Sequence, residues 1–378
     1  MRKPIESYRE LYPVTERRTW LNHASMGTYS RPVIEALNGY IHEHSVADFT
    51  IESHLEMDVR IRRAVASFIG AETAEIAFTK NTPDGLNIVA NGLDWSPGDR
   101  VVIADQEFPA NVYPWLNLQR KGVEVVRVKS VDGRVPLEEV LGLIEGRTRL
   151  VSLSWVEFMS GFRNDIASIA AACRSRDVIF CVDAIQALGV FPIDIHAVGV
   201  DILATSSHKW LLSPTGVGWM YVRKGVLERI AVTSMGQSSV VRNVSLDYLN
   251  FDLPLWPDAR RFEPGIHNQL GLIGLEAAIG LFNEVGLDRV RDRVKHLTDL
   301  AVTGLRERGY TVLSSRDGEE WSGAVCFSSP RYSAEEIHSA LGENDVVISL
   351  RKPIVRLSPH YYNNEEDISR FLQALPRH

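Results

Sequence analysis

Cysteine is scarce in this sequence, which limits the scope for cross-links and for metal binding. The three cysteines are Cys173, Cys181 and Cys326, and they lie far apart with no CxxC pair. This spacing predicts neither a disulfide framework nor a zinc site, and we expect no metal centre. A reducing, cytoplasmic setting fits such cysteine usage best.

Long apolar runs and an excess of positive charge are also missing. No run of 18 apolar residues occurs, so no membrane-spanning helix is predicted, and Met1–Ser7 lacks the apolar stretch of a signal peptide. Lys and Arg number 41 against 48 Asp and Glu, a net charge of −7. We therefore expect no broad cationic surface for nucleic acid or anionic lipid, although a local basic pocket is compatible with this charge.

What the sequence does contain is the profile of an ordinary globular protein. Its 378 residues are 45% hydrophobic and 24% charged, which suits two to three domains of roughly 150 residues each. Short apolar runs rich in β-branched residues predict buried strands. These runs are Arg100–Ala104, Val123–Val128, Arg149–Ser154, Val178–Asp183, Asp201–Thr205 and Val217–Val222.

Helical patterns separate several of these predicted strands. In Asn164–Arg176 the apolar residues recur on one stripe, as in a helix packed against a sheet. The alternation predicts an α/β fold with a mostly parallel sheet and helices on both faces. After Asn268 it gives way to a long helical stretch, broken near Gly286, and then to weaker strand and helix signals. We expect an arm over residues 1–20, a large domain over residues 21–268 and a small C-terminal α+β domain over residues 269–378.

Two polar clusters directly follow predicted strands, and open α/β sheets bind ligands beyond the carboxyl ends of their strands. One begins at Asp183 and the other contains His208 and Lys209. A lysine at a strand end is ordinarily a surface residue, but Lys209 lies between a strand, His208 and Trp210, which predicts an enclosed setting. Desolvation lowers the pKa of an amine, and a lowered pKa lets lysine attack a carbonyl and hold a Schiff base.

Both clusters resemble motifs of a known family, the class V aminotransferases. The family's Schiff-base signature is similar to Ser206-Ser207-His208-Lys209 followed by Pro214-Thr215-Gly216-Val217-Gly218, and its pyridine-binding element is similar to Asp183-Ala184-Ile185-Gln186. The resemblance extends from about Trp20 to Ser358. The group includes cysteine desulfurases and isopenicillin N epimerase-like enzymes, which use pyridoxal phosphate (PLP).

This resemblance implies a fold, a cofactor and a class of substrate. The fold would be PLP fold type I, with a large, mostly parallel-sheet domain and a smaller C-terminal α+β domain. The cofactor would be pyridoxal 5′-phosphate, and the substrate a small-molecule amino acid processed through a Schiff base on Lys209. The protein would have to hold the PLP ring, keep its nitrogen protonated and fix its phosphate.

The resemblance assigns three residues to the PLP ring. Asp183 would face the pyridine nitrogen and raise its pKa. Gln186 would hydrogen-bond to the phenolic oxygen, and Phe108 would stack on the ring where desulfurases have a histidine that can move protons. The plain alternatives are a capping aspartate, a glutamine on a helix surface and a core phenylalanine.

The phosphate is expected at a helix start, where backbone N–H groups point outward. Thr82 and Pro83 open a predicted helix after the strand-like Ile76–Thr79, and Ser206 and His208 would add side-chain donors. The family usually has a second threonine where Pro83 stands. Because proline has no N–H, Thr82 and the amide of Asp84 are expected to make the contact. An ordinary helix cap is the plain alternative.

The resemblance also implies substrate-binding residues and a partner subunit. Arg356 would bind the substrate α-carboxylate as a two-pronged donor, and Asn22 and His23 would line the same cleft. Residues 261–268 resemble a loop that completes the phosphate site of the neighbour in a homodimer. Ile266 stands where the family often has threonine, so backbone amides or His267 would have to substitute.

Two differences from the desulfurase motifs limit the possible reactions. Desulfurases carry a nucleophilic cysteine shortly before the carboxylate-binding arginine, and Val346–Ile354 has none. Phe158 stands where desulfurases have asparagine, which is closer to the epimerase-like branch. We therefore expect an aminotransferase or epimerase, with a persulfide-independent C–S or β-elimination lyase as the alternative. The sequence does not distinguish transamination, epimerisation and elimination, nor does it identify the substrate.

Two other classes of protein fit the sequence less well. An NAD-dependent dehydrogenase should carry a GxGxxG motif after its first strand, and the sequence has none there. A PLP-fold protein that has lost its activity and serves as a binding module should have lost its key residues. Asp183 and Lys209 are both present, which favours an enzyme.

Overall fold

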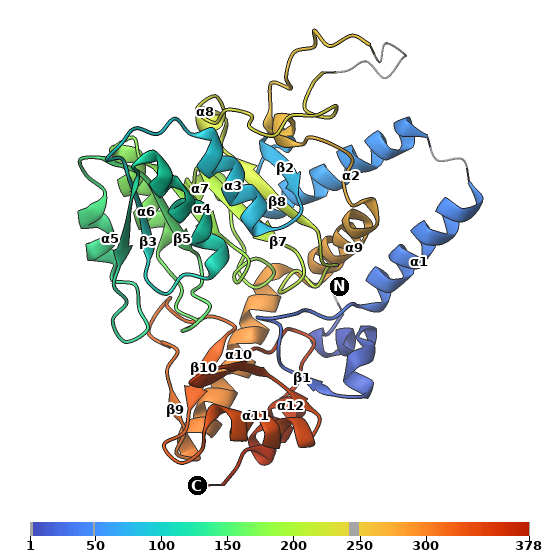
Figure 1. Ribbon diagram of the computed structural model, residues 1–378. Helices are drawn as coiled ribbons and strands as arrows, with labels where there is room; N and C mark the ends of the chain where they lie inside the picture. The colour runs from blue at the N-terminus through green and yellow to red at the C-terminus, as the bar shows by residue number, and fades with distance from the viewer. Residues whose placement is uncertain (1–2, 48–49, 242–248, 378) are drawn as a thin grey trace.

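The structure is a computed structural model, which describes residues 3–47, 50–241 and 249–377 (Figure 1). A seven-stranded sheet forms its centre, in the order β2-β8-β7-β6-β5-β3-β4. All of its neighbouring pairs are parallel except those of β8, which runs antiparallel to both β2 and β7. The strands are β2 (Ile76–Thr79), β3 (Arg100–Ala104), β4 (Glu124–Val128), β5 (Thr148–Ser154), β6 (Ile179–Asp183), β7 (Ile202–Ser206) and β8 (Gly218–Val222).

Helices cover both faces of this sheet, as the alternating pattern predicted. Alternate residues of β3 show the two faces: Val101 and Ile103 pack into one apolar cluster, and Val102 and Ala104 into the other. The first cluster includes α3 (Thr82–Gly92), α4 (Tyr113–Leu116) and α8 (Lys224–Leu227). The second includes α2 (Ile51–Ile69), α5 (Leu137–Leu143), α6 (Ile166–Ser175), α7 (Ile195–Val198) and α9 (Gln269–Val285).

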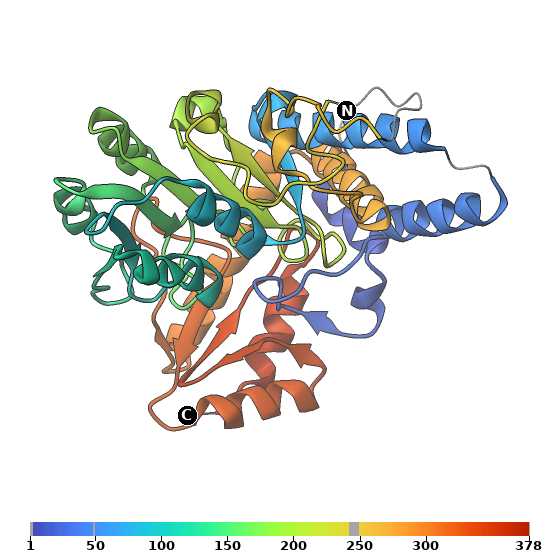
Figure 2. The ribbon, with the colours of Figure 1, turned by 45° about the horizontal axis from the view of Figure 1, so that its top comes forward.

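Helix α1 (Arg31–Val46) packs, like α2, along α9. The two helices project together from the body of the molecule, on the side away from β4 (Figure 2). A third apolar cluster lies between α10 (Leu287–Glu307) and a second, four-stranded sheet of order β12-β13-β10-β9. Its elements are β9 (Thr311–Val312), β10 (Val325–Ser328), α11 (Ala334–Glu343), β12 (Ser349–Arg351), β13 (Ile354–Leu357) and α12 (Glu365–Ala374).

The first residues form an arm that packs on the C-terminal part of the chain. The arm contains two 3-10 helices, Ile5–Leu11 and Pro13–Glu16, and ends in β1 (Thr19–Trp20), which pairs in parallel with β11 (Val346–Val347).

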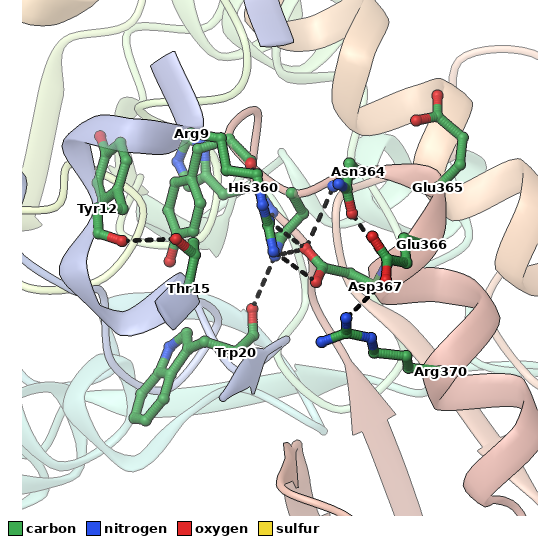
Figure 3. Close-up of polar contacts among 12 residues, drawn as sticks. Arg9, Tyr12, Thr15, Trp20, His360, Asn364, Glu365, Glu366, Asp367 and Arg370 are labelled. Carbon is green, nitrogen blue, oxygen red and sulfur yellow. Dashed lines mark hydrogen bonds and ion pairs between the residues drawn. The ribbon is translucent and has the colours of Figure 1, made fainter. Parts of the chain in front are cut away.

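An ion pair fixes this arm to α12 (Figure 3). Both terminal nitrogens of Arg9 donate to the Asp367 carboxylate, at 2.6 and 3.0 Å. The Asn363 amide also donates to Asp367, at 2.8 Å, and to the backbone oxygen of Trp20, at 3.2 Å. Because a paired fork of this kind is directional, it sets where the arm lies before the chain enters β1.

The topology brings several loops to one edge of the large sheet. Strands β2, β5, β6 and β7 point the same way, so their carboxyl ends meet at this edge, where open α/β sheets bind ligands. No single described helix is long and apolar enough to cross a membrane; α9 and α10 pass such a test only when joined, and they bend by 81° at the break.

Candidate active site

Lys209 lies in the loop after β7, at this edge, and its side chain is almost enclosed. The residue is 8% exposed, and Nζ lies 5.3 Å from the centre of the Phe108 ring. Burial lowers the pKa of Lys209 to about 8; Asp183 raises it, while Arg356 and Arg351 lower it further. A buried amine with such a pKa is partly neutral near physiological pH and is therefore nucleophilic.

Backbone contacts on both sides of Lys209 hold its loop. The amide of Gly27 donates to the carbonyl of His208 at 2.8 Å, and Nε2 of His360 donates to the carbonyl of Trp210 at 2.9 Å. A Cβ atom at Gly27 would overlap the carbonyl oxygen of Lys209, so glycine is required for this approach. The lysine is thus positioned by the N-terminal segment and by the C-terminal part of the chain together.

Asp183 is the last residue of β6, and its carboxylate is buried. Its Oδ1 accepts a hydrogen bond from the amide of Ile185 at 3.0 Å. Burial raises the pKa of Asp183 to about 6, against the opposing effects of that N–H group and of Lys209. The carboxyl group is therefore mainly ionised at neutral pH and can pair with a protonated ring nitrogen.

The amide of Gln186 is committed on two sides. Its Oε1 accepts from the Trp210 indole at 2.8 Å, and its Nε2 donates to the carbonyl of Ala24 at 3.0 Å. An amide nitrogen carries two hydrogens, so one N–H is left for a ligand. The contact with a phenolic oxygen stays a prediction that this second N–H can meet.

The predicted phosphate residues come together at the start of α3. The Thr82 amide donates to Oγ of Ser206 at 2.8 Å, and the two hydroxyl oxygens are 3.1 Å apart. Pro83 occupies the second position of this helix, where its missing N–H costs no helical hydrogen bond. The expectation for Asp84 needs correction, because its amide donates to the side chain of the capping residue Asn81, at 3.0 Å, and is not free.

His208 and Phe108 lie beside the lysine. Burial lowers the pKa of His208 to about 4, with the charge of Lys209 as the second cause, so the imidazole is neutral at neutral pH. The Phe108 ring is partly exposed and meets the Phe158 ring edge-on, with 5.2 Å between their centres. Aromatic side chains thus line one side of the space next to Lys209.

Arg356 is fully buried, and its contacts are with neutral oxygens. Its Nη1 donates to the carbonyl of Phe158 at 2.7 Å, and its Nη2 donates to the Ser25 hydroxyl at 3.0 Å. Its Nε–H has no partner in the described part of the chain. A buried guanidinium without a carboxylate is costly, which is consistent with a site that receives an anion.

The structure gives His23 a structural role rather than the expected place in the substrate cleft. Its ring is fully buried; Nδ1 donates to the carbonyl of Ser358 at 2.8 Å, and Nε2 accepts from the Tyr362 hydroxyl at 2.7 Å. Both nitrogens are therefore occupied. Its neighbour Asn22 has a buried Oδ1 without a partner among the described residues, and its role at the substrate stays a prediction.

Ile266 lies apart from Lys209, on the outer surface between the 3-10 helix Ala259–Phe262 and α9. It is 79% exposed, in a loop bordering the start of α3. The imidazole of His267, considered as a substitute donor, contacts Glu263 at 3.0 Å. The role of this loop at the phosphate of a partner subunit stays a prediction.

Sequence reasoning missed two buried acids and one arginine near the lysine. Glu107 accepts from both the amide and the hydroxyl of Ser154, each at 2.6 Å, and burial raises its pKa to about 7. Burial also raises the pKa of Glu157 well above its usual range. The missed arginine is Arg351, which donates to Ser25 at 3.1 Å. Glutamate after a strand end was the available signal for Glu107.

The donor set at this edge fits PLP. It offers an enclosed amine of lowered pKa, a buried carboxylate facing the same space, and a pair of hydroxyls with a helix start beside them. Arg356 lies within electrostatic range of Lys209. These are the groups needed to bond a carbonyl carbon, pair with a ring nitrogen, hold a phosphate and bind a carboxylate.

Comparisons of the sequence with known proteins point to one family. The family model "Aminotransferase class-V" matches residues 28–371. A Bacillus subtilis (strain 168) protein named as the uncharacterized aminotransferase YcbU is 30% identical over 373 residues, covering 98% of this chain and 97% of that protein. A probable cysteine desulfurase of Pyrococcus abyssi is 29% identical over 401 residues, with coverages of 99% and 97%.

Solved structures with a similar fold come from the same group of enzymes. The apo cysteine desulfurase from Thermococcus onnurineus NA1 has a TM-score of 0.89 at 27% identity, covering 99% of this chain and 97% of its own. The cystine C–S lyase C-DES, solved with cysteine persulfide, has a TM-score of 0.88 at 24% identity, with coverages of 96% and 98%, and shows the fold alone. The predicted PLP fold type I is confirmed. The chain belongs to the class V aminotransferase family of PLP-dependent enzymes.

Proposed function

We propose that the enzyme transforms an α-amino acid without a persulfide, as an aminotransferase or an epimerase. The observation that supports this most is the hairpin before Arg356, in which a turn of only two residues, Lys352 and Pro353, joins β12 to β13. This turn contains no cysteine, and two residues are too few to form a mobile loop. The three cysteines are buried and unpaired.

Cys326 is the thiol that lies opposite Arg356 in the neighbouring strand β10. It is fully buried, and burial raises the pKa of its thiol. A thiol kept protonated and enclosed is a poor nucleophile, since the thiolate is the reactive form. This position therefore does not replace the missing loop cysteine.

In the proposed mechanism, each residue holds one part of the reacting assembly. PLP, when bound, supplies an electron sink for the negative charge that develops at the Cα atom of an amino acid. Asp183 would keep the ring nitrogen protonated, and Thr82 with Ser206 would hold the phosphate. Arg356 orients the substrate through its α-carboxylate.

Lys209 would have two tasks in this mechanism. Its amine would hold the cofactor through the carbonyl carbon, and the same amine, when free, would accept a proton from Cα of the substrate. With a pKa near 8, the free amine is suited to proton transfer close to neutral pH. Transamination would require the proton to reach a carbon other than Cα, and epimerisation would require an acid that protonates Cα from the opposite face.

A persulfide-independent C–S or β-elimination lyase is the second candidate. It is favoured by relatives whose names are those of cysteine desulfurases, at 29% identity over nearly the whole chain. The same lysine would remove the Cα proton, and a sulfur leaving group would then depart from Cβ. The two candidates share every residue named above and differ in their products.

The products on a panel of amino acids test this proposal. The purified PLP-loaded enzyme is incubated with each amino acid, with and without a keto-acid acceptor, and the products are followed by mass spectrometry and chiral chromatography. We expect either a keto acid and a new amino acid in equal amounts, or inversion without net conversion. Sulfide, persulfide or pyruvate formed from cysteine or cystine without an acceptor would favour the lyase.

We propose further that two copies pair through the surface around Ile266. This surface exposes several large apolar side chains, which soluble monomers seldom gather in one place. Leu55 is 45% exposed, Val59 is 51% exposed and Ile266 is 79% exposed, and all three line one groove. In such a dimer, the loop over residues 261–268 would reach the phosphate residues of the neighbour. The cytoplasmic setting also stays a prediction.

Sedimentation velocity of the PLP-loaded enzyme tests the pairing. We expect the mass of two chains, and we expect Ile266→Asp to shift the equilibrium toward one chain because it places a charge in the covered face. Val131→Asp introduces the same charge at an exposed position in a turn and should leave the mass unchanged. A fully active wild-type enzyme with the mass of one chain would contradict the proposal.

A further inference from the structure

The β12–β13 hairpin carries two arginines on one face. Ser349 lies opposite Arg356, and Arg351 lies opposite Ile354. Cross-strand partners in an antiparallel pair share a face, and so do residues two apart on one strand. Arg351 and Arg356 therefore point to the same side of the sheet, toward Ser25.

The Ser25 hydroxyl joins the two guanidinium groups. It lies 3.0 Å from Nη2 of Arg356, 3.1 Å from Nη2 of Arg351 and 2.7 Å from the hydroxyl oxygen of Ser349. A guanidinium can only donate, so the Ser25 oxygen accepts from both arginines and sends its own hydrogen to Ser349. The hydroxyl holds the arginines in place without neutralising them.

Both arginines keep unused donors that are shielded from water. In the described part of the chain, the hydrogen bonds of these two side chains go to neutral oxygens, those of Ser25 and, for Arg356, also of Phe158. The Nε–H of each arginine is buried without a partner. A buried donor left unpaired costs free energy, and a buried charge costs more.

The charges around the lysine leave a positive surplus at neutral pH. Arg351, Arg356 and Lys209 are mutually repelling cations, as the lowering of the Lys209 pKa by both arginines shows. Among the described residues, Asp183 is the carboxylate that acts on Lys209, and in the proposed function it pairs with the cofactor ring. Burial raises the pKa of Glu107 to about 7, so that acid is only half ionised there.

One carboxylate does not account for both arginines. A single guanidinium satisfies a carboxylate through two parallel N–H···O bonds, so Arg356 alone is sufficient for an α-carboxylate. Arg351 would then keep its charge and its buried Nε–H without a partner. A ligand with a second anionic group would pair with the guanidinium of Arg351.

We propose that the substrate carries two acidic groups, with Arg356 binding the α-carboxylate and Arg351 binding an acidic group on the side chain. The substrate class is a dicarboxylic amino acid together with the corresponding keto acid. This inference rests on the proposed function, because that function places the α-carboxylate on Arg356. It adds Arg351 as the residue that sets substrate specificity.

Two unreactive probes of equal carbon number test the second anion site. Succinate has two carboxylates and butyrate has one, and neither has an amino group, so no turnover occurs. Their affinities for the PLP-loaded enzyme are measured by calorimetry and by the change in the visible spectrum. A hydrogen bond to a charged group predicts that succinate binds roughly 10- to 150-fold more tightly. Glutarate and pentanoate repeat the comparison at the next chain length.

Variants of the hairpin assign this preference to one residue. Arg351→Gln should bring the affinity for succinate down to that for butyrate, while the affinity for butyrate changes by less than about threefold. Lys352→Gln is the matched control: it removes a charge from the same hairpin, but Lys352 is exposed and pairs with Glu335 at 2.5 Å. It should change neither affinity. Arg351→Lys keeps the charge without the fork and should give an intermediate preference.

Two results would overturn the inference. Equal binding of succinate and butyrate by the wild-type enzyme, at both chain lengths, would show that no second anion is recognised. Equal loss of both probes in Arg351→Gln would place both arginines on one carboxylate. If that variant does not fold, the wild-type comparison still decides. Because neither probe reacts, a negative result here is distinct from a failed product analysis.

Discussion

Lys209→Met is expected to abolish turnover and, at the same time, to make the PLP-free protein more stable. Methionine keeps the length of the side chain but has no amine to bond the cofactor or to move the Cα proton. General acid–base groups contribute about 10²- to 10⁴-fold, so kcat should fall by at least about 10²-fold. Turnover is measured on whichever amino acid the product analysis identifies.

The stability gain follows from the burial of the amine. The pKa of Lys209 is lowered from 10.5 to about 8, so between these values the unfolded chain binds a proton that the folded chain has lost. Stability therefore rises with pH in this window, and below it the buried charge costs up to about 3 kcal/mol. Because Lys209 also offsets the charge of Asp183, we expect a gain of about 1–3 kcal/mol at pH 7 that shrinks toward pH 10. Urea unfolding of the PLP-free proteins measures it.

Lys224→Met is the matched control for Lys209→Met. Lys224 is exposed and pairs with Glu72 at 2.6 Å, so its replacement should leave turnover unchanged and should keep the rise in stability between about pH 8 and pH 10. Turnover of Lys209→Met within tenfold of the wild-type rate would contradict the assignment of Lys209. So would borohydride reduction of the PLP-loaded wild type that labels a peptide from another part of the chain.

The central sheet was predictable from the sequence because its strands are buried on both faces. Such strands appear as continuous apolar runs bounded by polar residues, as in β6 and β7. Their observed ends fall within a residue or so of the predicted ones. The antiparallel direction of β8 was not predictable in this way, since an apolar run of five residues is the same in either direction.

Elements held by distant partners were the ones that sequence reasoning could not place. No helices were predicted for residues 31–69, where α1 and α2 pack along α9, some 200 residues further on. Likewise, β1 has two residues and is a strand only because β11 lies beside it. A strand of two residues, such as β1, carries no period of its own.

The predicted site residues also fall into two groups: those placed by the sheet and those placed by contacts with distant residues. Asp183 and Lys209 follow strand ends, and the geometry of a parallel sheet brings strand ends together. The role of His23 depends on Ser358 and Tyr362, more than 330 residues away, so its sequence position could not reveal it.

The correction for Asp84 and the omission of Arg351 could both have been avoided from local sequence patterns. Asparagine before a threonine-proline helix start predicts a cap, and Asn81 indeed takes the amide of Asp84. Arg351 and Arg356 flank a lysine-proline pair, and a two-residue turn there would have placed both on one face.

Arg356→Ala is expected to weaken substrate binding strongly while leaving PLP in place. Removing one partner of a buried, hydrogen-bonded charge pair costs about 2–5 kcal/mol, a factor of roughly thirty to several thousand in affinity. Because the α-carboxylate is held in both the ground state and the transition state, most of the loss should appear in KM. Steady-state kinetics measure it, and the visible spectrum of the PLP-loaded variant should match that of the wild type.

A structural effect of the substitution can be separated from the effect on binding. Arg356→Ala leaves the carbonyl of Phe158 without its donor, so thermal unfolding of the variant has to be compared first. Arg356→Lys keeps the charge but not the fork, and should raise KM less than alanine does. Arg370→Ala removes an exposed arginine paired with Glu366 and should leave KM unchanged. If Arg356→Ala keeps the wild-type KM for every amino acid tested, the α-carboxylate is bound elsewhere, and the neighbouring Arg351 becomes the residue to test in its place.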